Sequence, residues 1–299
     1  MLPDQVKAMY VAAGRIYSSP WFYVLIAVIL TLELLWPAIK EQRVFSRALA
    51  QDFLWFNVDG VFKMAILPAY IGFLKIGYEK VTGGFSITAS DAWPLIVTIV
   101  VSFLLSDFLS WFHHWVRHKV TAFWHFHVIH HSQREMNLFT DLRVHSVEYL
   151  IAQTIMFIPL FMFPLDYPAI MGYGAVMIWY TRLIHANVRT NFGPLGYIFV
   201  SPQYHRIHHS IEPRHRDRNF GVITTIWDRL FGTIYPARDE YPQTGVDGID
   251  FVPPGKLSPI AWVGSLVQQF VYPFRQLMPA KKAAVPEAPS QDEPVQRAS

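Results

Sequence analysis

Apolar residues gather in five long stretches over the first two thirds of the chain. These stretches are 21–38, 54–74, 93–112, 147–165 and 167–185. Each has close to the ~20 apolar residues that an α-helix needs to cross the hydrocarbon core of a bilayer. The first stretch lacks the basic start, short apolar run and cleavage site of a signal peptide, so we interpret it as an anchor. The pattern predicts an all-α integral membrane bundle of about four to five spans.

Polar residues modify two of these predictions. The stretch 54–74 contains Asp59 and Lys63, so it spans the membrane, tilts or lies partly in the interface. The break between the last two stretches is short and turn-forming, with Pro164, Asp166 and Pro168. Because two apolar segments joined so tightly must turn back on each other, we predict a helical hairpin.

The chain becomes polar and proline-punctuated after Gly232. The segment 258–278 is amphipathic, which predicts an interfacial or cap-packing helix, and the tail from 280 has the composition of a disordered segment. The expected organisation is a membrane anchor with a second hydrophobic segment, a core that carries the histidine pattern described below, a C-terminal cap with an amphipathic helix, and a disordered tail. Their boundaries are 1–92, 93–235, 236–279 and 280–299.

Basic residues concentrate at one end of the predicted spans. Those at or after the ends of the first, third and fifth stretches include Lys40, Arg43, Arg47, Arg117, Lys119, Arg134, Arg143, Arg182, Arg189, Arg206, Arg214, Arg216, Arg218 and Arg229. The opposite end holds mainly Lys7, Arg15, Lys75 and Lys80. The positive-inside rule then places the N-terminus outside and this end in the cytoplasm. We favour a bacterial inner membrane over the endoplasmic reticulum.

Composition narrows the classes of function. Of 299 residues, 52% are hydrophobic and only 16% are charged, against about 25% in soluble domains. Cysteine is absent, which excludes disulfides, iron–sulfur clusters and thiolate metal sites. The formal net charge is +3, and the sequence has no arginine-rich stripe of the kind that binds nucleic acid.

Eight of the 13 histidines fall into three spaced boxes. The first reads HxxxH, and the second and third read HxxHH; together they contain His114, His118, His127, His130, His131, His205, His208 and His209. Residues at i, i+3 and i+4 share one helix face, so each box can aim its imidazoles at one point. Imidazole suits iron, zinc and copper, and eight imidazoles exceed the four positions of a tetrahedral zinc. The boxes predict a cytoplasmic helical cap that holds a dimetal site with open positions.

The remaining histidines give a weaker signal. By spacing alone, His185 is an ordinary histidine at a helix end, and His145 is either a ligand or a residue that orients an imidazole. His113 points about 100° away from its neighbour on a helix, so we interpret it as structural. His125 is expected not to be a ligand, and His215, in a basic loop, is expected to be solvated.

Two acidic residues near the predicted interface would be costly in a bilayer without partners. Asp107 and Glu148 are expected to accept hydrogen bonds from histidine N–H groups, or else to pair with Arg143 or Arg117. Asp228 lies in a turn-like segment, and we interpret it as cap structure and not as a catalytic group.

The segment 107–148 resembles the sterol desaturase and fatty acid hydroxylase superfamily. It fits D-x-x-x-[YW]-x-x-H-x-x-x-H, then W-x-x-H-x-x-H-H-S, then N-x-x-T-x-x-R-x-H-P-x-E. The matching residues are Asp107, Trp111, His114, His118, Trp124, His127, His130, His131, Ser132, Asn137, Thr140, Arg143, His145 and Glu148. Later segments are similar as well: HANVR at 185–189, PQYHRIHHS at 202–210, NFG at 219–221 and WDRLFGT at 227–233.

The resemblance covers about 95–235 and has three departures from the usual pattern. Trp115 stands where an arginine is common, Ser146 replaces a proline, and Ala186 replaces a serine. None of these changes removes a candidate metal ligand.

The resemblance implies a membrane-bound di-iron oxygenase that hydroxylates or desaturates a lipid. It implies two iron ions (Fe²⁺/Fe³⁺), O₂ as co-substrate, and electrons from NAD(P)H. The implied ligands are the eight box histidines with His185 as a ninth. The residues implied around them are His145, Asp107, Glu148 and Asn187. The chain has no GxGxxG or HPGG segment and no cysteine, so we expect a separate carrier, such as a ferredoxin or a cytochrome b5-like protein with its reductase.

Two other classes remain open at this point. A membrane zinc hydrolase would need fewer ligands and a general base. A metal transporter would place its ligands near the bilayer midplane, whereas these histidines lie beyond the predicted span ends. The sequence leaves open the lipid (sterol or hopanoid, acyl chain, ether lipid, carotenoid or amino-acid lipid), the choice between hydroxylation and desaturation, the electron donor and the oligomeric state.

Overall fold

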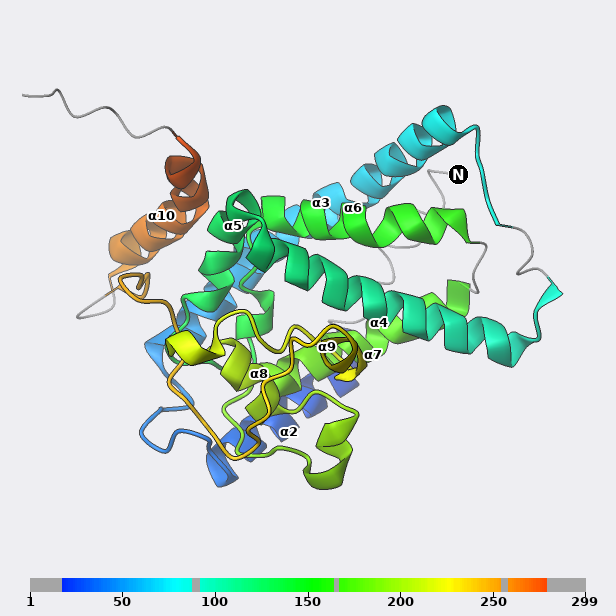
Figure 1. The fold of residues 1–299 in the computed structure, drawn as a ribbon. Coiled ribbons are helices and arrows are strands. Elements are labelled where there is room, and N and C mark those ends of the chain that lie inside the picture. Colours follow the sequence, from blue (N-terminus) through cyan, green and yellow to red (C-terminus); the bar gives the residue numbers. More distant parts are fainter. Residues whose placement is uncertain (1–17, 88–91, 164–166, 254–257, 279–299) are drawn as a thin grey trace, which may run out of the picture.

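The computed structural model describes residues 18–87, 92–163, 167–253 and 258–278, and this part of the chain is all-α (Figure 1). Extended pairing within it is limited to isolated β-bridges such as Phe199 with Thr224. The helices are α2 (Pro20–Leu35), α3 (Arg47–Thr82), α4 (Leu95–Lys119), α5 (Thr121–His131), η2 (Thr140–Leu142), α6 (Ser146–Met162), α7 (Tyr167–His185), η3 (Gly193–Tyr197), α8 (Pro202–His208), η4 (Pro213–His215), α9 (Ile226–Leu230) and α10 (Pro259–Leu277). The tail at 280–299 and the turn residues Pro164 and Asp166 lie outside the described residues.

The long helices are placed so that their histidine-bearing ends meet. α3 and α6 run in the same direction, because Tyr70 Oη lies 2.7 Å from Thr154 Oγ1 and the backbone N–H of Ile87 donates to Met162 O at their far ends. α4 runs against α6, since Arg117 near its end contacts Glu148 near the start of α6. The ends of α4 and α7 and the starts of α3 and α6 therefore form one end of the bundle, where α5 and α8 also lie (Figure 1).

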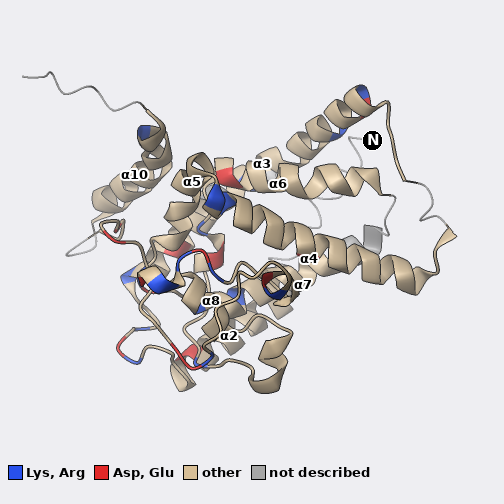
Figure 2. Cartoon of the chain, viewed as in Figure 1, with Lys and Arg blue, Asp and Glu red and all other residues tan. Residues whose placement is uncertain are grey.

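Charged residues concentrate at the same end of the bundle as the histidines. Figure 2 shows Lys, Arg, Asp and Glu positions around α5, α8 and the connecting segments, whereas the ribbons of α4 and α6 carry none over most of their length. Within the described residues α4 alone is, as a single helix, long and apolar enough to cross a bilayer, and α3 qualifies as a second if its two halves count as one span. α2, with 16 residues, rises only about 24 Å.

α3 bends by 43° between Arg47–Lys63 and Ala65–Thr82. Pro68 explains the bend, because its ring lacks an N–H and clashes with the carbonyl four residues earlier. The helix begins at Ser46, whose hydroxyl accepts a hydrogen bond from Leu49 N, and ends at Gly83, which has a φ of 66°.

One buried carboxylate joins α3 to the segment after α5. Asp52 is fully buried and accepts hydrogen bonds from the side chains of Gln133, Asn137, Thr140 and Arg143. Three of these donors belong to the N-x-x-T-x-x-R part of the sequence motif. This part of the motif therefore holds the chain against α3, and the partner of Arg143 is Asp52.

α10 packs on the histidine-bearing end. Its Leu266 joins a core cluster with Trp55 of α3 and with Val128 and Ile129 of α5. Because that packing uses one face, the opposite face exposes apolar side chains such as Ile260, of which 85% is exposed. α10 thus has the amphipathic character that the sequence predicts.

Candidate metal centre

Four helices bring nine histidines into the interior. They are His114 and His118 on α4, His127, His130 and His131 on α5, His185 at the end of α7, and His205, His208 and His209 on and just after α8. All are buried except His118, which is partly exposed. Their nitrogen atoms converge as two groups, and within each group the atoms lie within 4.8 Å of one another.

The groups divide the boxes in a regular way. The five-histidine group contains His114, His118, His127, His131 and His208, and the four-histidine group contains His130, His185, His205 and His209. In each HxxHH box the first and last histidines, one helical turn apart, share a group, and the middle one joins the other group. α5 and α8 thus exchange one histidine each, and this exchange places the two groups side by side.

The spacing of the ring nitrogens suits metal coordination. Nε2 of His131 lies 3.1 Å from His118 Nε2 and 3.2 Å from His127 Nε2, and Nε2 of His185 lies 2.9 Å from His205 Nε2. Two ligands at right angles, each about 2.1 Å from a metal, are separated by about 3 Å. Nε2 of His114 and of His208 is buried without a hydrogen-bond partner among the described residues. The nine imidazoles therefore fit two adjacent metal ions.

Burial keeps these imidazoles neutral. Desolvation lowers the pKa of His127, His130 and His131 on α5 well below the usual value, and neighbouring cationic groups lower it further. The pKa values of His205, His208 and His209 are lowered in the same way. Neutral imidazole is the form that binds a metal, so the site favours the metal-binding state at neutral pH.

Backbone carbonyls fix the orientation of several rings. Nδ1–H of His114 donates to Phe220 O at 2.9 Å, Nδ1–H of His208 donates to Arg218 O at 2.8 Å, and Nδ1–H of His185 donates to Thr181 O at 2.7 Å. A carbonyl only accepts, so Nδ1 carries the proton and the Nε2 lone pair faces the centre of the group.

Glu148 contacts the site directly. Nδ1 of His127 lies 2.7 Å from Glu148 Oε1, and the guanidinium of Arg117 contacts the same oxygen. All three side chains are buried. The carboxylate therefore orients His127, and Arg117 balances its charge.

The other expected supporting residues act at a greater distance. Asp107 accepts hydrogen bonds from Thr224 and Trp227, so it joins α4 to α9 and to the segment just before it. Asn187 accepts from the guanidinium of Arg206 on α8, and its backbone N–H donates to the buried Glu33 of α2.

His145 forms the N-cap of α6. Its Nδ1 accepts a hydrogen bond from Val147 N at 3.1 Å, and its Nε2 lies 3.2 Å from the carbonyl oxygen of Phe270 on α10. These contacts make His145 a structural link between α6 and α10.

Asp228 has a larger role than the sequence suggested. Its fully buried carboxylate accepts hydrogen bonds from Trp111 on α4, Tyr204 on α8 and the backbone N–H of Phe220. Further donors are Gly221 N and Thr233 Oγ1. Because the carbonyls of residues 218 and 220 hold two histidines, Asp228 fixes the loop that orients them. The sequence places Asp228 directly after Trp227 in the family-like segment 227–233, but the spacing of this segment does not relate it to the histidine boxes.

The loop also requires a glycine. A Cβ on Gly221 would lie 2.5 Å from Thr224 O and 3.0 Å from the carboxylate of Asp228. The close approach of the backbone to Asp228 therefore depends on the absence of a side chain.

The expectation for His215 was wrong. Its side chain is fully buried, with Nδ1 2.8 Å from Ser210 Oγ and Nε2 3.2 Å from Glu240 Oε2. His215 is buried although its loop is basic, because Ser210 and Glu240 provide hydrogen-bond partners for both ring nitrogens. His113 is buried and His125 is partly buried, and neither belongs to the two groups.

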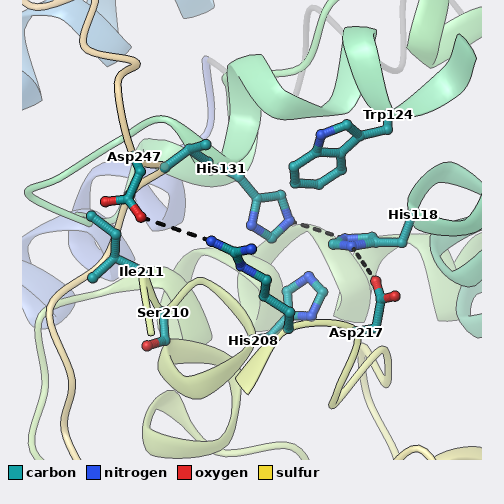
Figure 3. A pocket seen from close by; sticks show the side chains of 11 residues that line it. His118, Trp124, His131, His208, Ser210, Ile211, Asp217 and Asp247 are labelled. Atoms are coloured by element: carbon teal, nitrogen blue, oxygen red, sulfur yellow. Dashed lines mark hydrogen bonds and ion pairs between the residues drawn. The ribbon is translucent and has the colours of Figure 1, made fainter. Parts of the chain in front are cut away.

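A cavity opens onto the five-histidine group (Figure 3). It has a volume of about 360 Å³, and the rings of His118, His131 and His208 lie at its wall. Its rim is charged, with Asp217 3.6 Å from His118 Nδ1 and with an ion pair between Arg216 and Asp247. No histidine of the four-histidine group lines this cavity.

Fold and site together define a helical protein with one or two candidate spans and a histidine-rich candidate dimetal centre. The model of the fatty acid hydroxylase family matches residues 99–233. The segment 99–233, which is 135 of the 299 residues, is therefore a fatty acid hydroxylase family segment of the sterol desaturase superfamily, and through it the chain is similar to lipid hydroxylases and monooxygenases. The resemblance predicted from the motifs is confirmed.

Curated relatives agree with the family. Ornithine lipid hydroxylase OlsE from Rhizobium tropici is 31% identical over 159 residues, which cover 53% of this chain and 48% of that protein. Alkylglycerol monooxygenase from Danio rerio is 37% identical over 127 residues (41% of this chain, 27% of the relative), and that from Homo sapiens is 35% identical over 125 residues (41% and 27%). The match thus spans less than half of each relative's length. No solved structure matches the chain.

Proposed function

We propose that the protein is a membrane-bound di-iron oxygenase that hydroxylates or desaturates a lipid with O₂ and external electrons. The observation that carries the proposal is the division of nine buried imidazoles into adjacent groups of five and four within a fatty acid hydroxylase family segment. When bound, two iron ions would supply the activation of O₂ that oxidation of an unactivated C–H bond requires.

Iron fits the ligand set better than zinc. Five and four imidazoles exceed what a tetrahedral zinc site with an open position uses. Imidazole is a good ligand for iron, and C–H oxidation by O₂ needs a redox-active metal. The proposed ligands are the nine histidines of the two groups.

The protein's own groups would position the ligands and limit the access of water. Glu148 and the carbonyls of Phe220 and Arg218 hold ligand rings in one orientation. The ring of Phe220 lies 5.1 Å from that of His118, and the ring of Trp124, which lines the cavity of Figure 3, lies 5.0 Å from it. These aromatic rings would reduce the contact of His118 with water next to that cavity.

The substrate is proposed to be a membrane lipid. The names of the relatives indicate an ornithine lipid and an alkylglycerol as their substrates, so an amino-acid lipid and an ether lipid are the first compounds to test. Lipid profiles of cells with the active protein and with the His208→Ala variant, grown with O₂, should differ by one product that gains an oxygen or loses two hydrogens. Identical profiles would contradict the proposal. A product of bond hydrolysis formed without O₂ would support the zinc hydrolase instead.

The electrons are proposed to come from a separate carrier. Purified protein with iron, O₂, NADPH and a lipid extract should form no product until a ferredoxin or cytochrome b5-like protein and its reductase are added. Sustained turnover without these proteins would reveal an electron-entry site within the chain.

We also propose that four to five helices cross or enter the membrane, with the histidines on the cytoplasmic side of a bacterial inner membrane. The alternating directions of α3, α4 and α6 and the charge around α8 support this orientation. The chain lacks cysteine, so Arg214→Cys offers a single label on an exposed side chain. It should resist an impermeant thiol reagent in intact cells and react after permeabilisation; labelling from outside would invert the topology.

A further inference from the structure

We propose that a surface formed by η3 and α9 inserts into the bilayer beside α4, so that the chain meets lipid through its cap as well as through its spans. This apolar cap surface consists of Leu195, Tyr197, Ile198, Phe199, Ile226, Leu230 and Phe231. All seven are exposed, Leu195 by 61% and Leu230 by 68%. An exposed apolar patch of this kind, in a protein of a membrane family, indicates contact with a nonaqueous partner.

The two segments that carry the surface form one bonded unit. Phe199 and Thr224 form an antiparallel bridge, and the backbone N–H of Thr225 donates to Ile198 O at 2.8 Å. The hydroxyl of Thr225 donates to Tyr197 O at 2.8 Å. The exposed side chains are therefore held in place and are not the tip of a loose loop.

The unit is attached to the middle of α4. The indole N–H of Trp227 donates to Asp107 at 3.0 Å, that of Trp111 donates to Asp228 at 3.0 Å, and the ring of Phe231 stacks on Trp111 with centroids 4.6 Å apart. α4 begins at Leu95, so the attachment lies about 18–24 Å along the helix. A hydrocarbon core is about 30 Å thick. If α4 crosses it from Leu95, this level is still within the bilayer.

The surface continues the lipid-facing side of α4. Leu104, Phe108 and Phe112 recur at a spacing of four residues on this helix, and Leu104 is 38% exposed. The ring of Phe108 lies 5.0 Å from that of Trp227 and 6.3 Å from that of Phe231. One apolar surface thus runs from the span onto the cap without a polar gap.

Aromatic and basic side chains at the rim have the chemistry of a membrane interface. The guanidinium of Arg238 lies 4.0 Å from the centroid of the Tyr197 ring, and that of Arg229 lies 5.7 Å from it. Such pairs place a cation at the phosphate level while the ring stays in the apolar region. Continuity with α4 and this rim favour a bilayer over a second protein as the occupant.

Depth-dependent fluorescence quenching tests the inference without any turnover, so its outcome is separate from that of the proposed function. Because the chain has no cysteine, Leu230→Cys and Leu195→Cys can each carry one environment-sensitive dye in liposomes. Leu104→Cys on α4 is the lipid-facing reference, and Asp239→Cys, at an exposed position, is the aqueous reference. The two surface labels should be quenched by lipid-borne nitroxides, as at Leu104, and protected from a soluble quencher.

Two results would overturn the inference. Quenching of both labels by the soluble reagent to the extent seen at Asp239 would place the surface in water. Protection from both kinds of quencher, with crosslinking between labelled chains, would place a second copy on the surface instead.

Discussion

The imidazole rings of His131 and His209 stack with their centroids 4.3 Å apart and their planes 18° from parallel, although the two residues belong to different histidine groups. One comes from the end of α5 and the other follows α8. Two metal centres built from these groups would share this pair as their common wall. The exchange of His130 and His208 between the groups has the same consequence, because neither helix can move without disturbing both centres.

Removal of a single proposed ligand should abolish product formation. His118→Ala, His130→Ala and His208→Ala each take one imidazole from a group, whereas the apolar helices that carry insertion are unchanged. Each variant should remain in the membrane fraction and lose activity and metal. His113→Ala is the matched control, since His113 is buried next to a box but belongs to neither group. Retained activity in the three variants, or equal loss in the control, would indicate that these histidines serve folding.

His215→Ala should lower thermal stability while leaving the metal content near that of the unaltered protein. Both ring nitrogens of the buried His215 have polar partners, the half-buried Ser210 and Glu240, and each intramolecular hydrogen bond contributes about 0.5–1.5 kcal/mol. At about 2–4 °C per kcal/mol, the apparent Tm in detergent should fall by several degrees. An unchanged Tm would show that the hydrogen bonds of His215 contribute little.

Asp228→Asn should destabilise the protein and reduce metal binding together. Each carboxylate oxygen accepts at least two hydrogen bonds, so either orientation of an amide turns its NH₂ group towards donors from Trp111, Tyr204 or the backbone. The cost should be about 3 kcal/mol, since hydrogen bonds to a buried charged group are the stronger kind. Metal content and Tm should both fall, with Asp239→Asn as the exposed control. A lower Tm with full metal content would limit Asp228 to a structural role.

Asp141 should make stability depend on pH. Burial raises the pKa of its carboxyl from 3.8 to about 6, although Arg182 and Thr181 oppose the shift. A carboxyl with a raised folded-state pKa is favourable below the unfolded pKa, and that contribution is lost as pH rises through about 6. Asp141→Asn should therefore raise the apparent Tm at pH 7.5 and have a smaller effect at pH 4.5. An equal effect at both pH values would contradict the shift.

The sequence predicted the elements of the site better than their assembly. The HxxxH and HxxHH spacings predict that the histidines of a box share a helix face. They do not predict that His127 and His131 join one group while His130 joins the other. That division depends on how α5 and α8 cross. Asp228 and His215 escaped prediction for a related reason, because some of their partners, such as Trp111 and Glu240, come close only in the folded chain.

The spans were the less predictable part of the fold. Apolar runs predict that helices exist but not where they end. α2 stops at Leu35, because the residues that follow it form backbone hydrogen bonds with the segment after α7: Trp36 O accepts from Arg189 N, and Ala38 N donates to Asn187 O. Likewise, α3 passes as a span only if the two halves around the bend near Pro68 are counted together. The number of helices that cross a bilayer remains a prediction.

Metal stoichiometry tests the central claim most directly. Protein produced in iron-rich medium and purified without oxygen should hold about two metal ions per chain, because five and four neutral imidazoles converge at two adjacent points. Iron should predominate, and replacement by zinc would change the identity of the metal but not the count. A reproducible content of one metal ion per chain, in protein shown to be folded, would contradict the dinuclear account.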